Sequence, residues 1–489
     1  MFDLAVVLIA LGLLMYLAYR GFSLLVLAPA MALAAAGVTG GLPILAAYTK
    51  IFMTNTGSFI ISFFPLFMLG AIFGKLMDDT GSARSMAQSI STWLGPERAI
   101  LSVVLCCAAL TYGGVSAFVV VFAMLPIAAA LFRTADIPRR LIPGAIALGA
   151  FTFTMSALPG SPAIQNAIPM PFFGTTSFAA PGLGIVASAI MLGGGLWWLE
   201  RRARAARRAG ERYGKHDERV PEPDVALREH AQQEGFDINE LTPPATTAPV
   251  TAGSENLPPF ALAALPVLVV IVTNFAFVQF VVPRMDTSFL ADPLFGETTI
   301  EAVRGLWAVI LGLFLASLLL IVANWKRLTD VRASIDHGAD ASVLPIFNTA
   351  SLVGFGAVIA ALPVFGLIRD AVLGISDNPL IAVTGSVTIL SAMTGSASGG
   401  MSIALEALGP TFVDMAQQAG VSLDAMHRVT AMASGTLDVM PHSGAVITLL
   451  AVCGLTHRES YADVFLVASA VPIVAMLVSL VLVSVFGTF

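Results

Sequence analysis

The stretches Thr394-Gly-Ser-Ala-Ser-Gly-Gly400 and Asp438-Val-Met-Pro-His-Ser443 interrupt two long apolar runs in the second half of the chain. A similar pair, Thr111-Tyr-Gly-Gly-Val-Ser116 and Ser156-Ala-Leu-Pro-Gly-Ser161, interrupts two apolar runs in the first half. At membrane depth, non-helical backbone survives only where protein buries it or where it lines a cavity, because each unpaired N–H or C=O group costs several kcal/mol. Such breaks at corresponding places in two halves are typical of a substrate site near the midplane of a secondary transporter.

The composition of the chain indicates a membrane protein. Of the 489 residues, 57% are hydrophobic and 11% are charged, whereas about 25% of the residues of a typical soluble domain are charged. Cys106, Cys107 and Cys453 lie in apolar runs and predict no disulfide framework. The chain has no nucleotide-binding glycine-rich loop and no His or Cys run with metal-ligand spacing. We therefore expect no cofactor and no metal, and ATP-driven pumping is disfavoured.

The apolar runs predict an all-α polytopic membrane protein, since about 20 apolar residues cross a bilayer as a helix. Two re-entrant hairpins are predicted at 99–132 and 380–418, because each stretch is too long for one crossing and carries a polar kink in its middle. The ten predicted spans lie near 4–19, 22–38, 57–77, 142–174, 180–199, 259–282, 303–323, 343–368, 425–455 and 462–487, and the fourth and ninth are interrupted. The first run lacks a basic start and predicts a retained span, not a cleaved signal peptide.

The placement of basic residues predicts the topology. With the amino terminus on the periplasmic side of a bacterial inner membrane, most of the 25 Lys and Arg residues fall on the cytoplasmic side, as the positive-inside rule requires. Both termini are then periplasmic. The hairpin at 99–132 enters from the cytoplasm and the hairpin at 380–418 enters from the periplasm. Residues 1–199 and 259–489 are thereby predicted to be inverted repeats, each made of five spans and a hairpin with a broken helix at the midplane.

The segment 200–258 separates the two predicted repeats. It begins with a run of arginines, turns acidic and then becomes rich in Pro and Thr. The basic part is predicted to extend the preceding helix and to anchor it to anionic lipid headgroups. The remainder lacks the apolar residues of a core and is predicted to be a cytoplasmic linker.

The predicted breaks supply candidate substrate-binding residues. A helix interrupted within the membrane carries about half a positive charge at the start of its second part, and such an end binds an anion without a cationic side chain. Nearby hydroxyl and amide groups suit a small carboxylate that bears hydroxyls. The candidates are Tyr112, Gly113, Gly114, Ser116, Ser156, Ser161, Gln165, Asn166, Ser396, Ser398, Gly399, Thr436, His442 and Ser443. The alternative is that the Gly and Ser residues only permit close helix packing.

The second copy of the pattern carries ionisable residues where the first copy is neutral. Asp438, His442 and Glu406 are predicted to couple transport to protons, because ionisable residues at membrane depth are costly and functional by default. Asp438 and His442 are four residues apart and would share a helix face if the helical turn persists. The alternative is an Asp–His pair that fixes the break structurally. His427 and Arg428 are expected at the outer lip of their span, with snorkelling side chains.

Two stretches carry a family resemblance: Gly435-Thr-Leu-Asp-Val-Met-Pro-His-Ser-Gly-Ala-Val-Ile-Thr-Leu-Leu450 and Gly454-Leu-Thr-His-Arg-Glu-Ser-Tyr461. Apart from the central linker, the chain resembles the gluconate permease (GntP) family of the ion transporter superfamily, and it looks most like the branch of 3-hydroxybutyrate permeases. Gluconate permeases carry a Ser-His-x-Asn-Asp segment where this chain has Met440-Pro-His-Ser-Gly444, which disfavours gluconate itself. The resemblance implies a proton-linked importer of small hydroxy acids, with re-entrant hairpins, an elevator-type movement and a homodimeric assembly.

These observations favour a secondary active transporter that takes up a small hydroxy-monocarboxylate, such as 3-hydroxybutyrate or a gluconate-like hydroxy acid, with protons. Its partners would be the small organic anion and membrane lipids, and no nucleic acid. One alternative is sodium-coupled transport of a di- or tricarboxylate, and another is a membrane receptor that signals through 200–258. An enzyme is not expected, because Asp438, His442 and Ser443 are adjacent on one broken helix and so do not form a catalytic triad.

Overall fold

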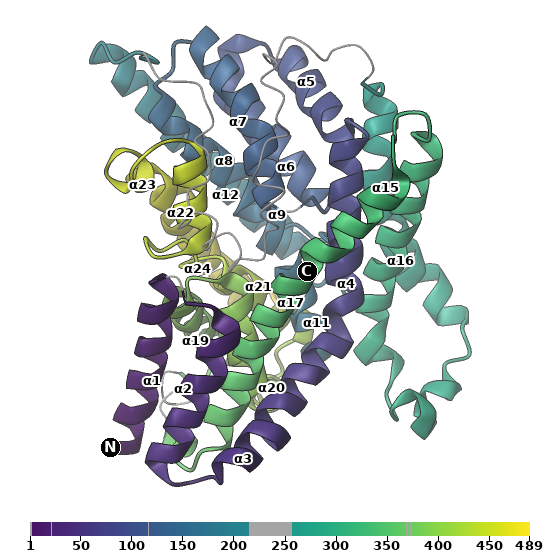
Figure 1. Ribbon diagram of the computed structural model, residues 1–489, viewed down its shortest axis with the longest axis vertical. Coiled ribbons are helices and arrows are strands. Elements are labelled where there is room, and N and C mark those ends of the chain that lie inside the picture. Colours follow the sequence, from purple (N-terminus) through teal and green to yellow (C-terminus); the bar gives the residue numbers. More distant parts are fainter. Residues whose placement is uncertain are drawn as a thin grey trace.

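The computed structural model describes residues 2–20, 22–115, 117–214, 257–367, 370, 374 and 376–489. These residues form an all-helical structure in which no β-strand occurs (Figure 1). The predicted class, an all-α polytopic membrane protein, is confirmed. Within the predicted linker, the basic run continues the preceding helix to Arg208, as expected. Residues 215–256 of that linker lie outside the described residues.

The first half of the chain alternates long helices with short ones. Its helices are α1 (Phe2–Tyr19), α2 (Leu24–Thr39), α3 (Ile44–Ala46), α4 (Met53–Asp79), α5 (Ser82–Leu94), α6 (Ala99–Tyr112), α7 (Ala117–Thr134), α8 (Ile142–Ala150), α9 (Phe153–Ser156), α10 (Ile164–Ala167), α11 (Pro169–Phe173) and α12 (Pro181–Arg208). A π-helical turn over Ala47–Phe52 joins α3 to α4. The chain bends by 106° between α5 and α6.

The second half has a comparable order of elements. Its helices are α15 (Phe260–Ala276), α16 (Ile300–Ala323), α17 (Val331–Ala361), α19 (Pro379–Thr394), α20 (Ala397–Ala419), α21 (Leu423–Ser434), α22 (Gly444–Val452), α23 (His457–Phe465) and α24 (Val471–Phe486). In each half two helices precede a long one, and a tightly turned helix pair and a broken helix follow. The helix pairs are α6 with α7 and α19 with α20, and the arms of each pair pack against each other.

Six stretches of the described chain are long and apolar enough to cross a membrane. They are Ile44–Asp79, Pro181–Arg208, Phe260–Arg284, Ile300–Ala323, Val331–Ala361 and His457–Phe486. Each overlaps one of the predicted spans, but Ile44–Asp79 and Val331–Ala361 begin well before the spans predicted at 57–77 and 343–368. The other four predicted spans are either short apolar helices, α1 and α2, or helices interrupted in the middle. The total of ten crossings, the membrane face of each hairpin and the division at 199 and 259 stay predictions.

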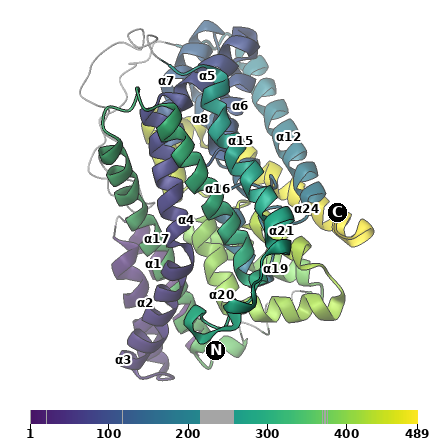
Figure 2. The same cartoon turned by 90° about the vertical axis from the view of Figure 1, so that its right-hand side faces the viewer.

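The long helices α4 and α17 cross the molecule side by side (Figures 1 and 2). Gly338, near the start of α17, lies against Ile72, near the end of α4, where an added Cβ would come within 2.6 Å of the Ile72 Cα. Gly354, near the end of α17, lies against Thr56, near the start of α4. The two helices are therefore antiparallel, and small residues allow their backbones to approach closely.

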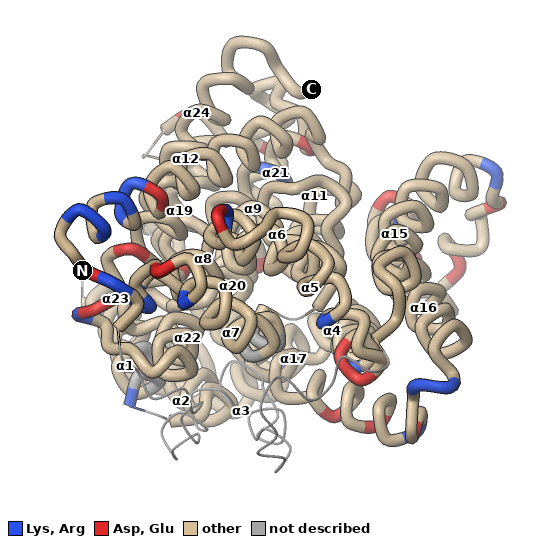
Figure 3. The backbone as a smooth tube through the Cα atoms, turned by 90° about the horizontal axis from the view of Figure 1, so that it is seen from above, with Lys and Arg blue, Asp and Glu red and all other residues tan. Residues whose placement is uncertain are grey.

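A network of charged groups joins α12 to α23, where basic residues gather in Figure 3. The Asp463 carboxylate, whose side chain is 2% exposed, accepts hydrogen bonds from Arg202 at 2.8 Å, Trp198 at 2.9 Å and Arg140 at 3.2 Å. Arg140 also donates two hydrogen bonds to the Glu211 carboxylate, at 2.7 and 2.9 Å. This bidentate contact lowers the pKa of Glu211 from its ordinary value. The network fixes the start of the predicted linker to the loop before α8.

Candidate functional site

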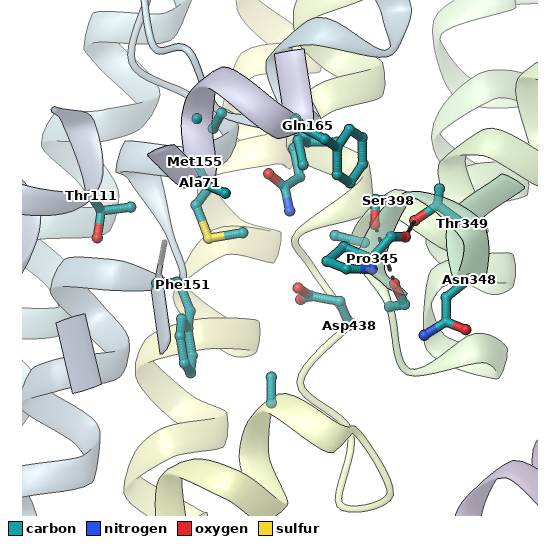
Figure 4. A pocket seen from close by; sticks show the side chains of 18 of the residues that line it. Ala71, Thr111, Phe151, Met155, Gln165, Pro345, Asn348, Thr349, Ser398 and Asp438 are labelled. Carbon is teal, nitrogen blue, oxygen red and sulfur yellow. Dashed lines mark hydrogen bonds between the residues drawn. The ribbon is translucent and has the colours of Figure 1, made fainter. Parts of the chain in front are cut away.

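A cavity of about 300 Å³ lies at the centre of the molecule, where α4 and α17 meet all four predicted breaks. Its wall combines the tip between α6 and α7, the tip between α19 and α20, the break after α9 and the break after α21. Figure 4 shows the side chains of Gln165, Ser398 and Asp438 around a common space. The polar residues of the lining are Lys75, Thr111, Gln165, Ser342, Asn348, Thr349, Thr394, Ser396, Ser398, Asp438 and Ser443.

Three helices of substantial length begin at this cavity. Ala117, the first residue of α7, is part of the lining. Ser396 caps α20 and lines the cavity together with Ala397. Ser443 precedes α22 and lines the cavity together with Ala445. The positive ends of three helix dipoles therefore point at one space, which favours negative charge there.

Glycines with positive φ form the two tips. Gly114 has a φ of 93° between α6 and α7, and Gly395 has a φ of 64° between α19 and α20. Backbone in this left-handed region strains any residue that has a Cβ. After Gly395, the Ser396 hydroxyl accepts a hydrogen bond from the Gly399 N–H at 3.2 Å and starts the next helix. The chain thus reverses direction within a few residues at each tip, and both tips form part of the cavity wall.

The second break spans the non-helical residues between Ser434 and Gly444. The Ser443 hydroxyl donates to the Gly395 carbonyl oxygen at 2.9 Å, which fastens this break to the tip between α19 and α20. Asp438 lies in the middle of the break, is 8% exposed and lines the cavity. The helical turn that would place Asp438 and His442 on one face is absent, because the backbone around them is not helical.

Polar side chains at the first break donate hydrogen bonds to backbone carbonyl oxygens of the surrounding chain. The Ser161 hydroxyl donates to the Thr154 carbonyl oxygen at 2.8 Å. The Asn166 amide donates to the carbonyl oxygens of Ser161, at 2.9 Å, and Ser177, at 3.0 Å. The Tyr112 hydroxyl donates to the carbonyl oxygen of Pro159 at 2.6 Å. These contacts pair several polar groups along the non-helical path of the first break.

The predicted site residues fall into two groups. Six of them line the cavity: Gly114, Gln165, Ser396, Ser398, Asp438 and Ser443. The others lie behind the wall or away from it: Tyr112, Gly113, Ser156, Ser161, Asn166, Gly399, Glu406, Thr436 and His442. Ser116 lies outside the described residues. The structure therefore brings the four breaks together, and binding and proton coupling by these residues stay predictions.

The expected position of His427 and Arg428 is wrong. Both side chains are 0% exposed, so neither snorkels to a lipid surface. His427 contacts the Thr175 hydroxyl at 2.6 Å and the Asn166 side-chain oxygen at 3.2 Å. The two residues lie in the first turns of α21, and the first break packs around them instead of leaving them at the membrane surface.

Sequence reasoning missed the lining that the long helices supply. Asn348 and Thr349 of α17 and Lys75 of α4 line the cavity, and Lys75 forms an ion pair with Asp79 at 2.9 Å. Two signals were present, because a polar pair interrupts an apolar run at 348–349 and each long helix has an internal proline, Pro65 or Pro345.

Thr111, the last cavity-lining residue of α6, was also missed. Its side chain is 4% exposed, and within the described part of the chain its hydroxyl forms no hydrogen bond. A buried hydroxyl of this kind is available to a bound molecule, since buried polar groups in native proteins usually have a partner.

The chain is 41% identical over 469 residues to the "uncharacterized transporter YxjC" of Bacillus subtilis (strain 168). The match covers 95% of each chain. The chain belongs to the family of that transporter. No family model matches it. Membership of this family, together with the apolar helices, supports a transport function and a multi-pass membrane protein, and it suggests a role other than catalysis. The likeness to the gluconate permease family and its 3-hydroxybutyrate branch stays a resemblance.

Proposed function

We propose that the chain is a secondary active transporter that takes up a small hydroxy-monocarboxylate, such as 3-hydroxybutyrate, together with protons. The observation that carries this proposal is the convergence of three helix N-termini, those of α7, α20 and α22, on one cavity of about 300 Å³. The N–H groups of a helix's first turn are unpaired within the helix, and the dipole adds positive charge. A bound carboxylate would accept hydrogen bonds from these N–H groups and would be attracted by the positive end of each helix dipole.

The side chains around these helix ends suit the rest of such a substrate. The hydroxyls of Ser396 and Ser398 lie 3.4 Å apart at the start of α20. The buried hydroxyl of Thr111 and the amide of Gln165 face the same cavity. These groups can donate to or accept from a substrate hydroxyl. The apolar residues that α4 and α17 also contribute to the lining, such as Phe67 and Leu352, would lie against a short carbon chain.

Asp438 is the proposed proton-carrying group. Its side chain lies in the same cavity as the helix N-termini. When ionised it repels a substrate carboxylate, and when protonated it can donate a hydrogen bond to that carboxylate. Proton binding and anion binding therefore favour each other, and this coupling is reciprocal. A proton gradient would thus drive uptake of the anion.

Several further features belong to the same proposal. The protein would lie in a bacterial inner membrane, with periplasmic termini and the linker at 200–258 in the cytoplasm. The resemblance supports a homodimer and an elevator-type movement. Sodium-coupled transport of a di- or tricarboxylate is the competing transport reaction. In a receptor, shortening the linker would abolish signalling, whereas in a transporter it would leave accumulation intact.

The test is uptake of labelled 3-hydroxybutyrate into proteoliposomes under an inward proton gradient, with and without sodium. Accumulation that needs the proton gradient and not sodium is expected. Uptake only in the presence of sodium would reassign the coupling ion. Absence of uptake in both conditions would reject this substrate, and a panel of other carboxylates measured in the same liposomes would then identify the class.

A further inference from the structure

Arg428 is a fully buried cation that holds the first break from the opposite half of the chain. It belongs to α21, and its side chain is 0% exposed. Its guanidinium donates to the carbonyl oxygens of Ala179, at 2.9 and 3.0 Å, and Ser177, at 3.0 Å, and to the side-chain oxygen of Asn166 at 2.9 Å. A longer contact, 3.4 Å, reaches the carbonyl oxygen of Ser156. These acceptors lie on both sides of the first break.

Two of the four acceptor residues of Arg428, Ser156 and Asn166, are next in the chain to residues of the cavity lining. Ser156 follows Met155 in the chain, and Asn166 follows Gln165. Both Met155 and Gln165 line the cavity. The guanidinium therefore hydrogen-bonds to residues that adjoin the cavity lining in the chain, and its side chain is fully shielded from bulk solvent.

The positive charge of Arg428 is solvated but not neutralised. Its partners are carbonyl and amide oxygens, which carry only partial charges. Asp424, one turn earlier on α21, is exposed, and none of the ion pairs formed by the described residues includes Arg428. Burying a cation without a counterion is costly, and in an apolar surrounding its field is weakly screened. A purely structural clamp could be built from neutral donors such as Asn166.

We propose that Arg428 gives the cavity its preference for anions. It supplies a fixed positive charge behind the wall. Its hydrogen bonds to Ser156 and Asn166 also position Met155 and Gln165, the lining residues next to them in the chain. The helix N-termini contact the anion, and Arg428 raises the electrostatic potential of the whole cavity without touching it. This inference deepens the proposed function and rests on it.

The test measures the electrostatic potential in the cavity and needs no transport substrate. In a background with Cys106, Cys107 and Cys453 replaced by alanine, A71C places a single thiol on α4, where Ala71 lines the cavity (Figure 4). The thiol is reacted with an anionic and a cationic methanethiosulfonate reagent of similar size. The ratio of the two rate constants reports the sign and strength of the local potential, because attraction of a charged reagent raises its local concentration.

In this background, R428Q is expected to lower the anionic-to-cationic rate ratio at least tenfold, whereas R428K keeps the ratio within twofold. R139Q is the matched control: Arg139 is also buried, at 7% exposure, and donates to a backbone carbonyl, that of Cys453, at 2.9 Å. Its acceptor, Cys453, is not next in the chain to a residue of the cavity lining, so the R139Q ratio should stay within twofold of the parent.

N166D provides a second, nearly isosteric variant. It places a carboxylate on the oxygen that now accepts from Arg428 at 2.9 Å, so the pair becomes neutral while the arginine stays in place. The ratio should again fall at least tenfold. The proposal is overturned if either R428Q or N166D gives a single folded peak in size-exclusion chromatography and keeps the parental anionic-to-cationic rate ratio. If the variants lower the rate ratio as expected but the parent protein does not take up 3-hydroxybutyrate, only the substrate assignment is rejected.

Discussion

Replacing Gly400 by alanine tests how the tip between α19 and α20 is held in the cavity wall. Gly400 lies in the first turn of α20, next to the capping residue Ser396. An added Cβ would meet the backbone of α19 at Ser391, and it would lie 2.5 Å from the carbonyl carbon of Leu390. No side-chain rotation relieves this clash, since the atoms belong to the facing backbone.

The size of the effect follows from these distances. Ordinary Cβ contacts begin at 3.4 Å, so the arms must separate by at least the difference between 3.4 and 2.5 Å, about 0.9 Å, because the Ser391 backbone lies even closer than the Leu390 carbonyl carbon. Overpacking of this kind costs about 1–3 kcal/mol. The separation moves Ser396 and Ser398 away from the opposite wall. We expect a lower unfolding temperature and a transport rate reduced at least tenfold, because misplacement by about 1 Å at a binding site is costly.

The assay compares G400A with G193A in detergent and in proteoliposomes. Gly193 lies within α12, and among the described residues no heavy atom outside its chain neighbours and its own helix backbone lies within 4 Å of an added Cβ. Alanine at an open helical position stabilises by up to about 1 kcal/mol, so G193A should keep or raise the unfolding temperature and transport normally. The close approach of the two arms would be refuted if G400A matched G193A in both measurements.

Three further predictions concern the second break and the charged network. D438N should abolish accumulation driven by a proton gradient while leaving substrate exchange, and proton-driven accumulation at the wild-type level would remove Asp438 from coupling. S443A loses the hydrogen bond to the Gly395 carbonyl oxygen and should raise the KM for the anion severalfold, while the unfolding temperature changes by no more than a few degrees. An unaltered KM would contradict a role for this hydrogen bond in binding. The Arg140 hydrogen bonds lower the pKa of Glu211, so their stabilising effect is full above the ordinary glutamate pKa of about 4.3 and is lost as the pH falls through the lowered value. E211Q should therefore unfold at a lower temperature than the parent near pH 7, with the gap closing below about pH 4; a gap that is constant with pH would assign the effect to packing.

The apolar runs and the four breaks were readable from the sequence because each leaves a local signature. Runs of membrane length identify helices without knowledge of their neighbours. Glycine and proline near residues 114, 159, 395 and 441 end helices by their own backbone preferences. The sequence could thus predict that these breaks meet at one place, since unpaired backbone in a membrane needs a common buried environment.

Other features depend on contacts that the local sequence does not encode. Arg428 directly follows His427 in the sequence, and two adjacent basic residues are typical of an exposed helix end; only the fold reveals that Arg428 donates to the carbonyl oxygens of Ser177 and Ala179. Thr436 and His442 stand in the second break near Asp438, yet of these three residues only Asp438 lines the cavity. Which side chains of a break face inward is decided by tertiary packing.

The bonds that fix the cavity wall also determine when the site can form during synthesis of the chain. Arg428 follows Asn166 by 262 positions, and Asp463 follows Arg140 by 323. A ribosome has therefore delivered the whole first half to the membrane long before its partners emerge. Until then the first break lacks the donors that satisfy its carbonyl groups, and Arg140 lacks its buried carboxylate. The first half must therefore remain in the bilayer as an incomplete intermediate until the second half has been inserted.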